Sequence, residues 1–149
     1  MAKVTRLAIH KGKDAELSIG GIDVRACRRE IEGIDGGVTL QVFAAVGGET
    51  SELVRFDCFR ERPHYHAPGE NAEETAIDKD AVGNVRSWIE AQLTGNLAAL
   101  LEQAGHAELK SDLDFAAIAK AAPRLTALLD ALPEPSETSY FELDEPLEL

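Results

Sequence analysis

The hydrophobic pattern of the chain changes its period once, near residue 67. Before that point apolar residues alternate with polar ones in short runs, and glycine-containing turns separate the runs. After that point apolar residues recur every three or four positions over longer stretches. Alternation is typical of strands with one buried face, and the longer period is typical of amphipathic helices. Strands followed by helices, rather than strands and helices in alternation, predict an α+β fold.

The first part of the chain carries the strand signals. Runs of strand character cover residues 4–11, 15–19, 21–27, 38–46 and 51–60, and a short further strand carries two histidines. Turn signals separate several of these runs, at Gly20-Gly21, Asp35-Gly36 and Gly47-Gly48. Turn signals at such regular spacing favour hairpins between strands that follow one another. We therefore expect an antiparallel β-meander of four to six strands over about residues 3–67.

The second part of the chain carries the helix signals. Apolar residues at helical spacing, with capping aspartates before them and Gly105 after them, predict a helix over about residues 80–104. A Ser-x-x-Asp capping pattern predicts a short helix over about residues 112–121. Pro123 suits the first position of a last helix, over about residues 123–132. These helices are expected to pack on one face of the sheet.

The last residues differ from the rest of the chain. Residues 133–149 contain six acidic residues, no basic residue and three prolines, interleaved with aromatic residues and leucines. Such alternation is typical of disordered segments that bind partners. An extended arm on the protein's own sheet, or on a sister subunit, is the other interpretation. We therefore divide the chain into one α+β domain, residues 1–133, and an acidic tail, residues 134–149.

Size and charge limit the classes of function. The 149 residues fit one domain, and Cys27 and Cys58 are too few and too far apart for a disulfide framework. The net charge is −12, and residues 67–149 supply all of it, because residues 1–66 hold equal numbers of acidic and basic side chains. Nucleic-acid binding needs a basic surface, so no nucleic-acid partner is expected.

No targeting or membrane segment is visible in the sequence. The N-terminal residues lack the apolar run of a signal peptide. No window approaches the run of about 18 apolar residues that marks a membrane-spanning helix. A cytoplasmic protein without membrane contact is therefore expected.

The middle of the chain holds the clearest chemical signal. His64 and His66 are spaced as His-x-His, with Asp57 before them and Glu70 after them. Residues two apart on a strand project from the same face, so both imidazoles would lie together. Two imidazoles and a carboxylate form the ligand set of many catalytic zinc and Fe(II) sites. We therefore predict a site for zinc, iron or manganese at the two histidines, with Asp57 or Glu70 as the third ligand.

The turn before the histidine strand decides which side chains meet across the hairpin. A two-residue turn would place Asp57 opposite His66, with both histidines on the face of that carboxylate. A three-residue turn would place Cys58 opposite His64, and the hairpin would then hold a cysteine–histidine pair. The sequence leaves both registers open.

Four other side chains are candidates for the same site. Arg55 shares a strand face with Asp57, and Cys58 joins in the second register. Tyr65 lies between the histidines, and His10 joins if the first strand neighbours the hairpin. Core packing is the alternative interpretation for Cys58 and Tyr65.

The spacing His64-x-His66-x-x-x-Glu70 resembles the first half of the cupin metal motif. The resemblance implies that these three residues act as metal ligands. It covers seven residues, and Cys58 and Ile77 stand where the motif has flanking glycines. No second histidine motif follows, and the chain becomes helical where a cupin needs more strands. We therefore do not extend the resemblance to the fold.

Two functions from different classes follow from these features. In the first, a metal ion acts as a Lewis acid or activates water for hydrolytic or lyase-type chemistry. In the second, the chain is a non-enzymatic accessory subunit, whose acidic tail and helices bind a protein partner or a second copy. If the histidines are ordinary polar residues of a half-exposed strand, the first function fails.

Overall fold

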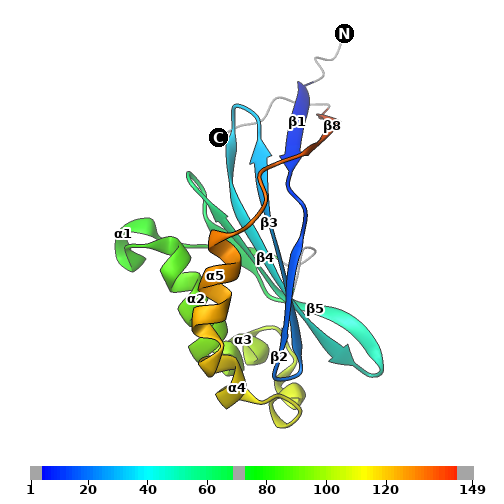
Figure 1. The fold of residues 1–149 in the computed structure, drawn as a ribbon, viewed down its shortest axis with the longest axis vertical. Coiled ribbons are helices and arrows are strands. Elements are labelled where there is room, and N and C mark those ends of the chain that lie inside the picture. Colours follow the sequence, from blue (N-terminus) through cyan, green and yellow to red (C-terminus); the bar gives the residue numbers. More distant parts are fainter. Residues whose placement is uncertain (1–4, 69–72, 144–149) are drawn as a thin grey trace.

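A computed structural model describes residues 5–68 and 73–143 (Figure 1). The strands are β1 Thr5–Lys11, β2 Ala15–Ile19, β3 Ile22–Ile31, β4 Asp35–Val46, β5 Glu49–Phe59, β6 His64–His66, β7 Glu74–Ala76 and β8 Glu137–Leu143. The helices are α1 Lys79–Val82, α2 Val85–Gly95, α3 Leu97–Gln103, the 3-10 helix η1 Ala107–Ser111, α4 Phe115–Lys120 and α5 Ala122–Asp130. The predicted α+β fold is confirmed, because antiparallel meander strands precede helices that pack on them.

All eight strands belong to one antiparallel sheet. Its order is β7-β6-β5-β4-β3-β1-β8, and β2 pairs with β3 beside β1. From β2 to β7 each strand pairs with the next strand in the sequence, as in an antiparallel meander. β3 is long enough to pair with β2 through its first residues and with β1 through its last.

The helices lie against one face of this sheet, on the left in Figure 1. Alternate residues of the central strands face them, and Val24, Val42 and Val54 are paired across three strands and fully buried. The helices contribute a matching set of buried side chains, among them Ile89, Leu93, Leu97, Leu101, Ile118, Leu125 and Leu129. Burying each such side chain contributes roughly 2 kcal/mol. This packing fixes which face of β5 points into the core and which face is left for a site.

The helix expected over residues 80–104 is divided into α1, α2 and α3. Gly83, with φ of 74°, ends α1, and the Asn84 side chain caps α2 by accepting a hydrogen bond from the Ser87 N–H. Asn96 separates α2 from α3. The apolar period continues across both breaks, which is why the pattern alone predicts one helix. None of the helices in the described residues is long and apolar enough to span a membrane.

Part of the acidic tail is a strand. β8 pairs with β1 along the whole length of both strands. Just before β8, the Ser136 N–H donates to the Lys11 carbonyl, and Glu134 contacts Arg28 at 2.9 Å. Residues 137–143 therefore lie on the chain's own sheet as an extended arm. Residues 144–149 lie outside the described residues, and partner docking through the tail stays a prediction.

Candidate metal centre

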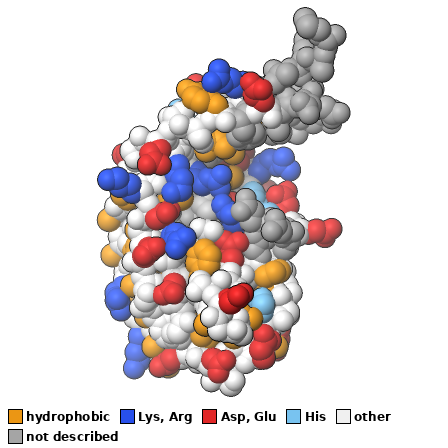
Figure 2. Space-filling view, turned by 90° about the vertical axis from the view of Figure 1, so that its right-hand side faces the viewer, with side chains coloured by type: hydrophobic (Ala, Val, Ile, Leu, Met, Phe, Trp, Pro, Cys, Tyr) orange, Lys and Arg blue, Asp and Glu red, His pale blue; other side chains and the backbone are white. Residues whose placement is uncertain are grey.

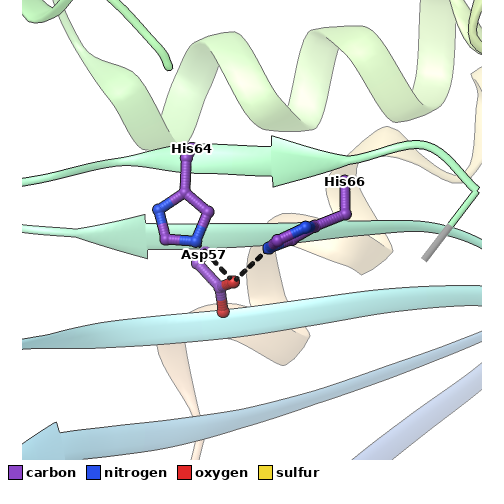
Figure 3. A group of neighbouring side chains, drawn as sticks. All are labelled: Asp57, His64 and His66. Atoms are coloured by element: carbon purple, nitrogen blue, oxygen red, sulfur yellow. Dashed lines mark ion pairs between the residues drawn. The ribbon is translucent and has the colours of Figure 1, made fainter. Parts of the chain in front are cut away.

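Asp57, His64 and His66 come together on the sheet face opposite the helices (Figure 3). The distance to Asp57 Oδ2 is 3.1 Å from His64 Nε2 and 3.8 Å from His66 Nε2. One ligand atom from each residue lies within 4.8 Å of the other two. Ligand atoms bound to one zinc ion lie roughly 3–4 Å apart. The three side chains are therefore close to the spacing that a metal ion requires.

The register of the β5–β6 hairpin creates this cluster. Residues 60–63 form the loop, and the strands pair Asp57 with His64 and Arg55 with His66. Neither the two-residue nor the three-residue turn considered from the sequence is present. The observed register differs from the two-residue register by two positions, and an even shift leaves every side chain on its face. Asp57 and both histidines therefore share a face, as the two-residue register predicts.

Asp35, at the start of β4, holds this loop. Its Oδ1 accepts hydrogen bonds from the backbone N–H groups of Gly36 and Glu61, and its Oδ2 accepts one from Arg62, at 2.8, 3.0 and 2.9 Å. Burial alone would raise the pKa of Asp35, but these three bonds hold it below its ordinary value. The ionised carboxylate therefore fixes the four-residue loop and, through it, the register of β6.

Hydrogen bonds behind the cluster orient its ligand atoms. His64 Nδ1 lies 2.8 Å from the Arg62 carbonyl oxygen, which only accepts, so Nδ1 carries a proton and donates. In the neutral imidazole, Nε2 then presents its lone pair beside Asp57. The buried Thr39 hydroxyl donates to Asp57 Oδ1 at 2.8 Å. Outer partners of this kind usually orient imidazole and carboxylate ligands in metalloproteins.

The charges of Asp57 and His64 depend on each other. Burial opposes ionisation of Asp57, but hydrogen bonds from His64 and Thr39 hold the pKa of this carboxyl below its ordinary value. The hydrogen bond to Asp57 raises the pKa of His64, and burial only partly opposes that effect. Without a metal, the two side chains therefore form an ion pair over a wider pH range than free side chains would.

The ion pair predicts a pH window for the metal-free protein. A raised His64 pKa stabilises the fold fully below the unfolded value, about 6.5, and this contribution is lost as the pH rises through the folded pKa. A lowered Asp57 pKa contributes above about 3.9, and this contribution is lost as the pH falls through the folded pKa. We expect His64→Gln to cost most stability between about pH 4 and pH 6.5.

Urea unfolding of the wild type and His64→Gln at about pH 5.5 and about pH 8.5 measures this window. The difference in unfolding free energy should be smaller at the higher pH. An equal or larger difference at the higher pH would contradict the ion pair.

Two further charged side chains border the cluster. Arg55 Nε lies 3.9 Å from Asp57 Oδ1, the oxygen that also binds Thr39. Glu74, on β7, places Oε2 3.5 Å from His64 Nε2, and about half of its side chain is exposed.

Figure 2 shows Lys and Arg side chains grouped across the middle of one face, beside a histidine, although the net charge of the chain is −12. The acidic excess is therefore not spread evenly over the surface.

Two of the other predicted site residues lie on the opposite side of the sheet. Tyr65 packs between Phe56 and Trp88, with ring-centroid distances of 5.8 and 6.2 Å. Cys58 packs against the core, where burial raises the pKa of its thiol. The structure therefore does not bring either side chain to the histidines, and the cysteine–histidine register is absent.

His10 and Glu70 are the other two predicted site residues. His10, on β1, contacts Thr138 and Glu32, with β3 and β4 between its strand and β5. Glu70 lies outside the described residues. Glu74 is the second acidic residue that the structure places beside His64.

Sequence reasoning missed Thr39, Glu74 and the Arg62 carbonyl. Thr39 is one of many strand residues, and only its pairing with Asp57 across β4 and β5 gives it a role. Glu74 follows the histidines closely enough to be considered, but no strand signal marked β7. The role of the Arg62 carbonyl follows from the loop conformation, which has no signature in the sequence.

The fold and the cluster define an α+β protein with a candidate metal centre on the sheet face away from its helices. The chain belongs to a family described as a domain of unknown function (DUF7700), whose family model matches residues 15–129. The matched residues include Asp57, His64 and His66 and end before β8. No curated protein and no solved structure matches the chain significantly. Function is therefore argued from the site itself.

Proposed function

We propose that the protein binds one divalent metal ion through Nε2 of His64, Nε2 of His66 and Oδ2 of Asp57. The observation that carries the proposal is that one ligand atom from each of the three residues lies within 4.8 Å of the other two. The Arg62 carbonyl and the Thr39 hydroxyl support it, because they hold the outer atoms of two of the three ligands. An ion pair alone would need only one of the two imidazoles.

The ligand set supports zinc, Fe(II) or manganese. Two imidazoles and one carboxylate bind zinc in catalytic sites and Fe(II) in facial triads, and harder carboxylate ligands also suit manganese. Three protein ligands leave at least one position for water or substrate. A bound metal would supply a Lewis acid and lower the pKa of bound water toward about 7. We infer hydrolytic or lyase-type chemistry as the activity that this site supports.

The surroundings of the cluster allow a substrate to approach. The side chains of His64 and His66 are 16% and 14% exposed, so the site is reachable from solvent. A hollow of about 220 Å³ lies beside His64, and its lining includes Arg62, Glu74 and Lys79. Glu74, close to His64 and half exposed, is positioned to exchange a proton with a bound water or substrate.

Arg55 has to be reconciled with a nearby cation. Its guanidinium approaches Asp57 Oδ1, whereas the closest contacts of the histidines are with Oδ2. The guanidinium charge would lower the affinity for a metal, because like charges repel at short range. We therefore expect tight binding only if the Asp57 oxygen nearest the histidines stays available.

Metal content of tag-free protein tests the proposal directly. After incubation with zinc, Fe(II) or manganese and desalting, mass spectrometry is expected to find about one metal ion per chain for the wild type. The double variant His64→Ala/His66→Ala should retain almost none. The chain offers a matched control, His10→Ala/His106→Ala, which removes the same number of imidazoles outside the cluster and should retain the metal.

Circular dichroism spectra of both double variants establish that the fold persists. No metal in the wild type after all three incubations would overturn the proposal. So would equal metal content in the two double variants. The cluster would then be an ion-paired structural feature, and the accessory-subunit hypothesis would stand alone.

A further inference from the structure

A second polar site, which we call the arginine pocket, lies at the helix-covered side of the sheet. It is a hollow of about 440 Å³ whose lining includes Arg28, Arg60, Arg86, Glu30, Glu134 and Leu129. These residues come from β3, the loop after β5, the first turn of α2, α5 and the segment after α5. Guanidinium groups from three separate parts of the chain therefore converge on one hollow.

The arginine pocket and the metal centre lie on opposite faces of the sheet. Arg28 pairs with Val38, which pairs with Cys58, and the last two pack against the core beneath the helices. Asp57 is the next residue to Cys58 on β5, so its side chain projects from the other face. A ligand in the arginine pocket would therefore not contact the three metal ligands.

Arg28, Arg60 and Arg86 are each paired with a carboxylate. Arg86 donates to Asp130 at 2.7 Å and to the Thr126 carbonyl at 3.1 Å, which ties α2 to α5. Arg60 donates through both terminal nitrogens to Glu30. Anchoring of this kind reduces the side-chain entropy that a bound ligand would otherwise cost.

Two of these arginines keep N–H groups for another acceptor. A guanidinium carries five N–H donors. Within the described part of the chain, Arg28 donates through Nη1 to Glu134. Arg86 donates through Nη2, its Nε lies 3.9 Å from Glu90 Oε2, and its Nη1 makes no hydrogen bond or ion pair with another described residue. Their remaining donors are partly exposed, in a hollow that also offers the apolar side chains of Leu129 and Val38.

We propose that the arginine pocket binds the phosphoryl group of a small organic phosphate, with the organic part against Leu129 and Val38. A phosphoryl group carries two negative charges near neutral pH and three acceptor oxygens, and planar guanidinium forks match these oxygens in pairs. A carboxylate offers only two oxygens and one charge. The pocket therefore favours a phosphate over a simple carboxylate.

Glu134 acts as an internal competitor for this ligand. Its side chain is 80% exposed and its ion pair with Arg28 spans 2.9 Å. An exposed ion pair of this kind contributes at most about 1 kcal/mol, so a dianion can displace it. Displacement of Glu134 would free the Arg28 donor and remove a repulsive charge from the pocket.

Calorimetric titration of the chelator-treated full chain tests the inference, with inorganic phosphate and phenyl phosphate as probes. Both probes are expected to bind, and phenyl phosphate more tightly, because its ring covers the apolar wall. Arg28→Gln and Arg86→Gln should each weaken binding by about tenfold, the loss of one charge-assisted hydrogen bond. Arg124→Gln, an exposed arginine of α5 outside the pocket lining, is the matched control and should leave the affinity unchanged.

Glu134→Gln is expected to change the affinity for phosphate in the opposite direction. Removal of the competing carboxylate should tighten phosphate binding a few-fold, and this surface change is not expected to affect folding. Three results would overturn the inference: no binding of either probe, an equal loss in Arg124→Gln, or a loss in His64→Ala/His66→Ala. The last result would place the anion at the metal centre, and it would leave the proposed metal binding intact.

Discussion

Replacing Asp57 by asparagine is expected to weaken the binding of a divalent metal at least about 100-fold. Asparagine keeps the size of the side chain and an oxygen for the Thr39 hydroxyl, but it removes the charge that balances the cation. Mutating an outer partner of a metal ligand already costs about 10- to 100-fold in affinity, so losing an anionic ligand costs more. The fold is expected to survive, because the substitution leaves no cavity.

Thermal unfolding with and without zinc measures this loss. Zinc at about 100 times the wild-type Kd stabilises the wild type by about 2.7 kcal/mol, or roughly 8 °C. At the same concentration, Asp57→Asn should gain only about 0.4 kcal/mol, or roughly 1 °C, over its own metal-free form.

Asp112→Asn is the matched control for this experiment. Asp112 is exposed, lies at the end of η1 and is outside the cluster. Its variant should show the full wild-type shift with zinc. A full shift in Asp57→Asn as well would show that the carboxylate is not a ligand.

The residues of the cluster could be predicted because side chains alternate between the two faces of a strand with a period of two. His64 and His66 are two apart on one strand, and Asp57 has the matching parity on the strand before it. The predicted register differs from the observed one by two positions, and the face assignment survives because that shift is even. A register shifted by one position would have placed Cys58, not Asp57, beside the histidines.

The loop length itself could not be predicted, because its cause is distant in the sequence. Asp35 accepts hydrogen bonds from Glu61 and Arg62, more than twenty residues further along the chain. Nothing in the loop residues records that contact. The same holds for β8, whose pairing with β1 joins the two ends of the chain, and for the contact between Arg28 and Glu134 in the arginine pocket.

Asp35→Asn is expected to destabilise the fold by about 2 kcal/mol near neutral pH. The carboxylate uses both oxygens to accept three backbone N–H groups. The amide keeps one oxygen and turns an NH2 group toward at least one of these N–H groups, and two donors cannot satisfy each other. Hydrogen bonds to a charged acceptor contribute about 1.5–3 kcal/mol, which sets the expected size.

The effect of Asp35→Asn should also reach the metal centre. The Arg62 N–H binds Asp35, and the Arg62 carbonyl accepts from His64 Nδ1. A loop that shifts at Arg62 therefore changes the orientation of the imidazole. Zinc affinity is expected to fall by about tenfold, as for other outer partners of metal ligands, whereas Asp112→Asn should change neither affinity nor stability.

The pH dependence separates this role of Asp35 from general destabilisation. Because the folded-state pKa of Asp35 is lowered, its contribution is present above the unfolded value of about 3.9 and is lost as the pH falls through the folded pKa. The difference in unfolding free energy between the wild type and Asp35→Asn, measured in urea, should therefore be constant near neutral pH and shrink toward about pH 3. A difference that stays unchanged in acid would mean that the charge of the carboxylate does not hold the loop, and the link from Asp35 through Arg62 to His64 would fail with it.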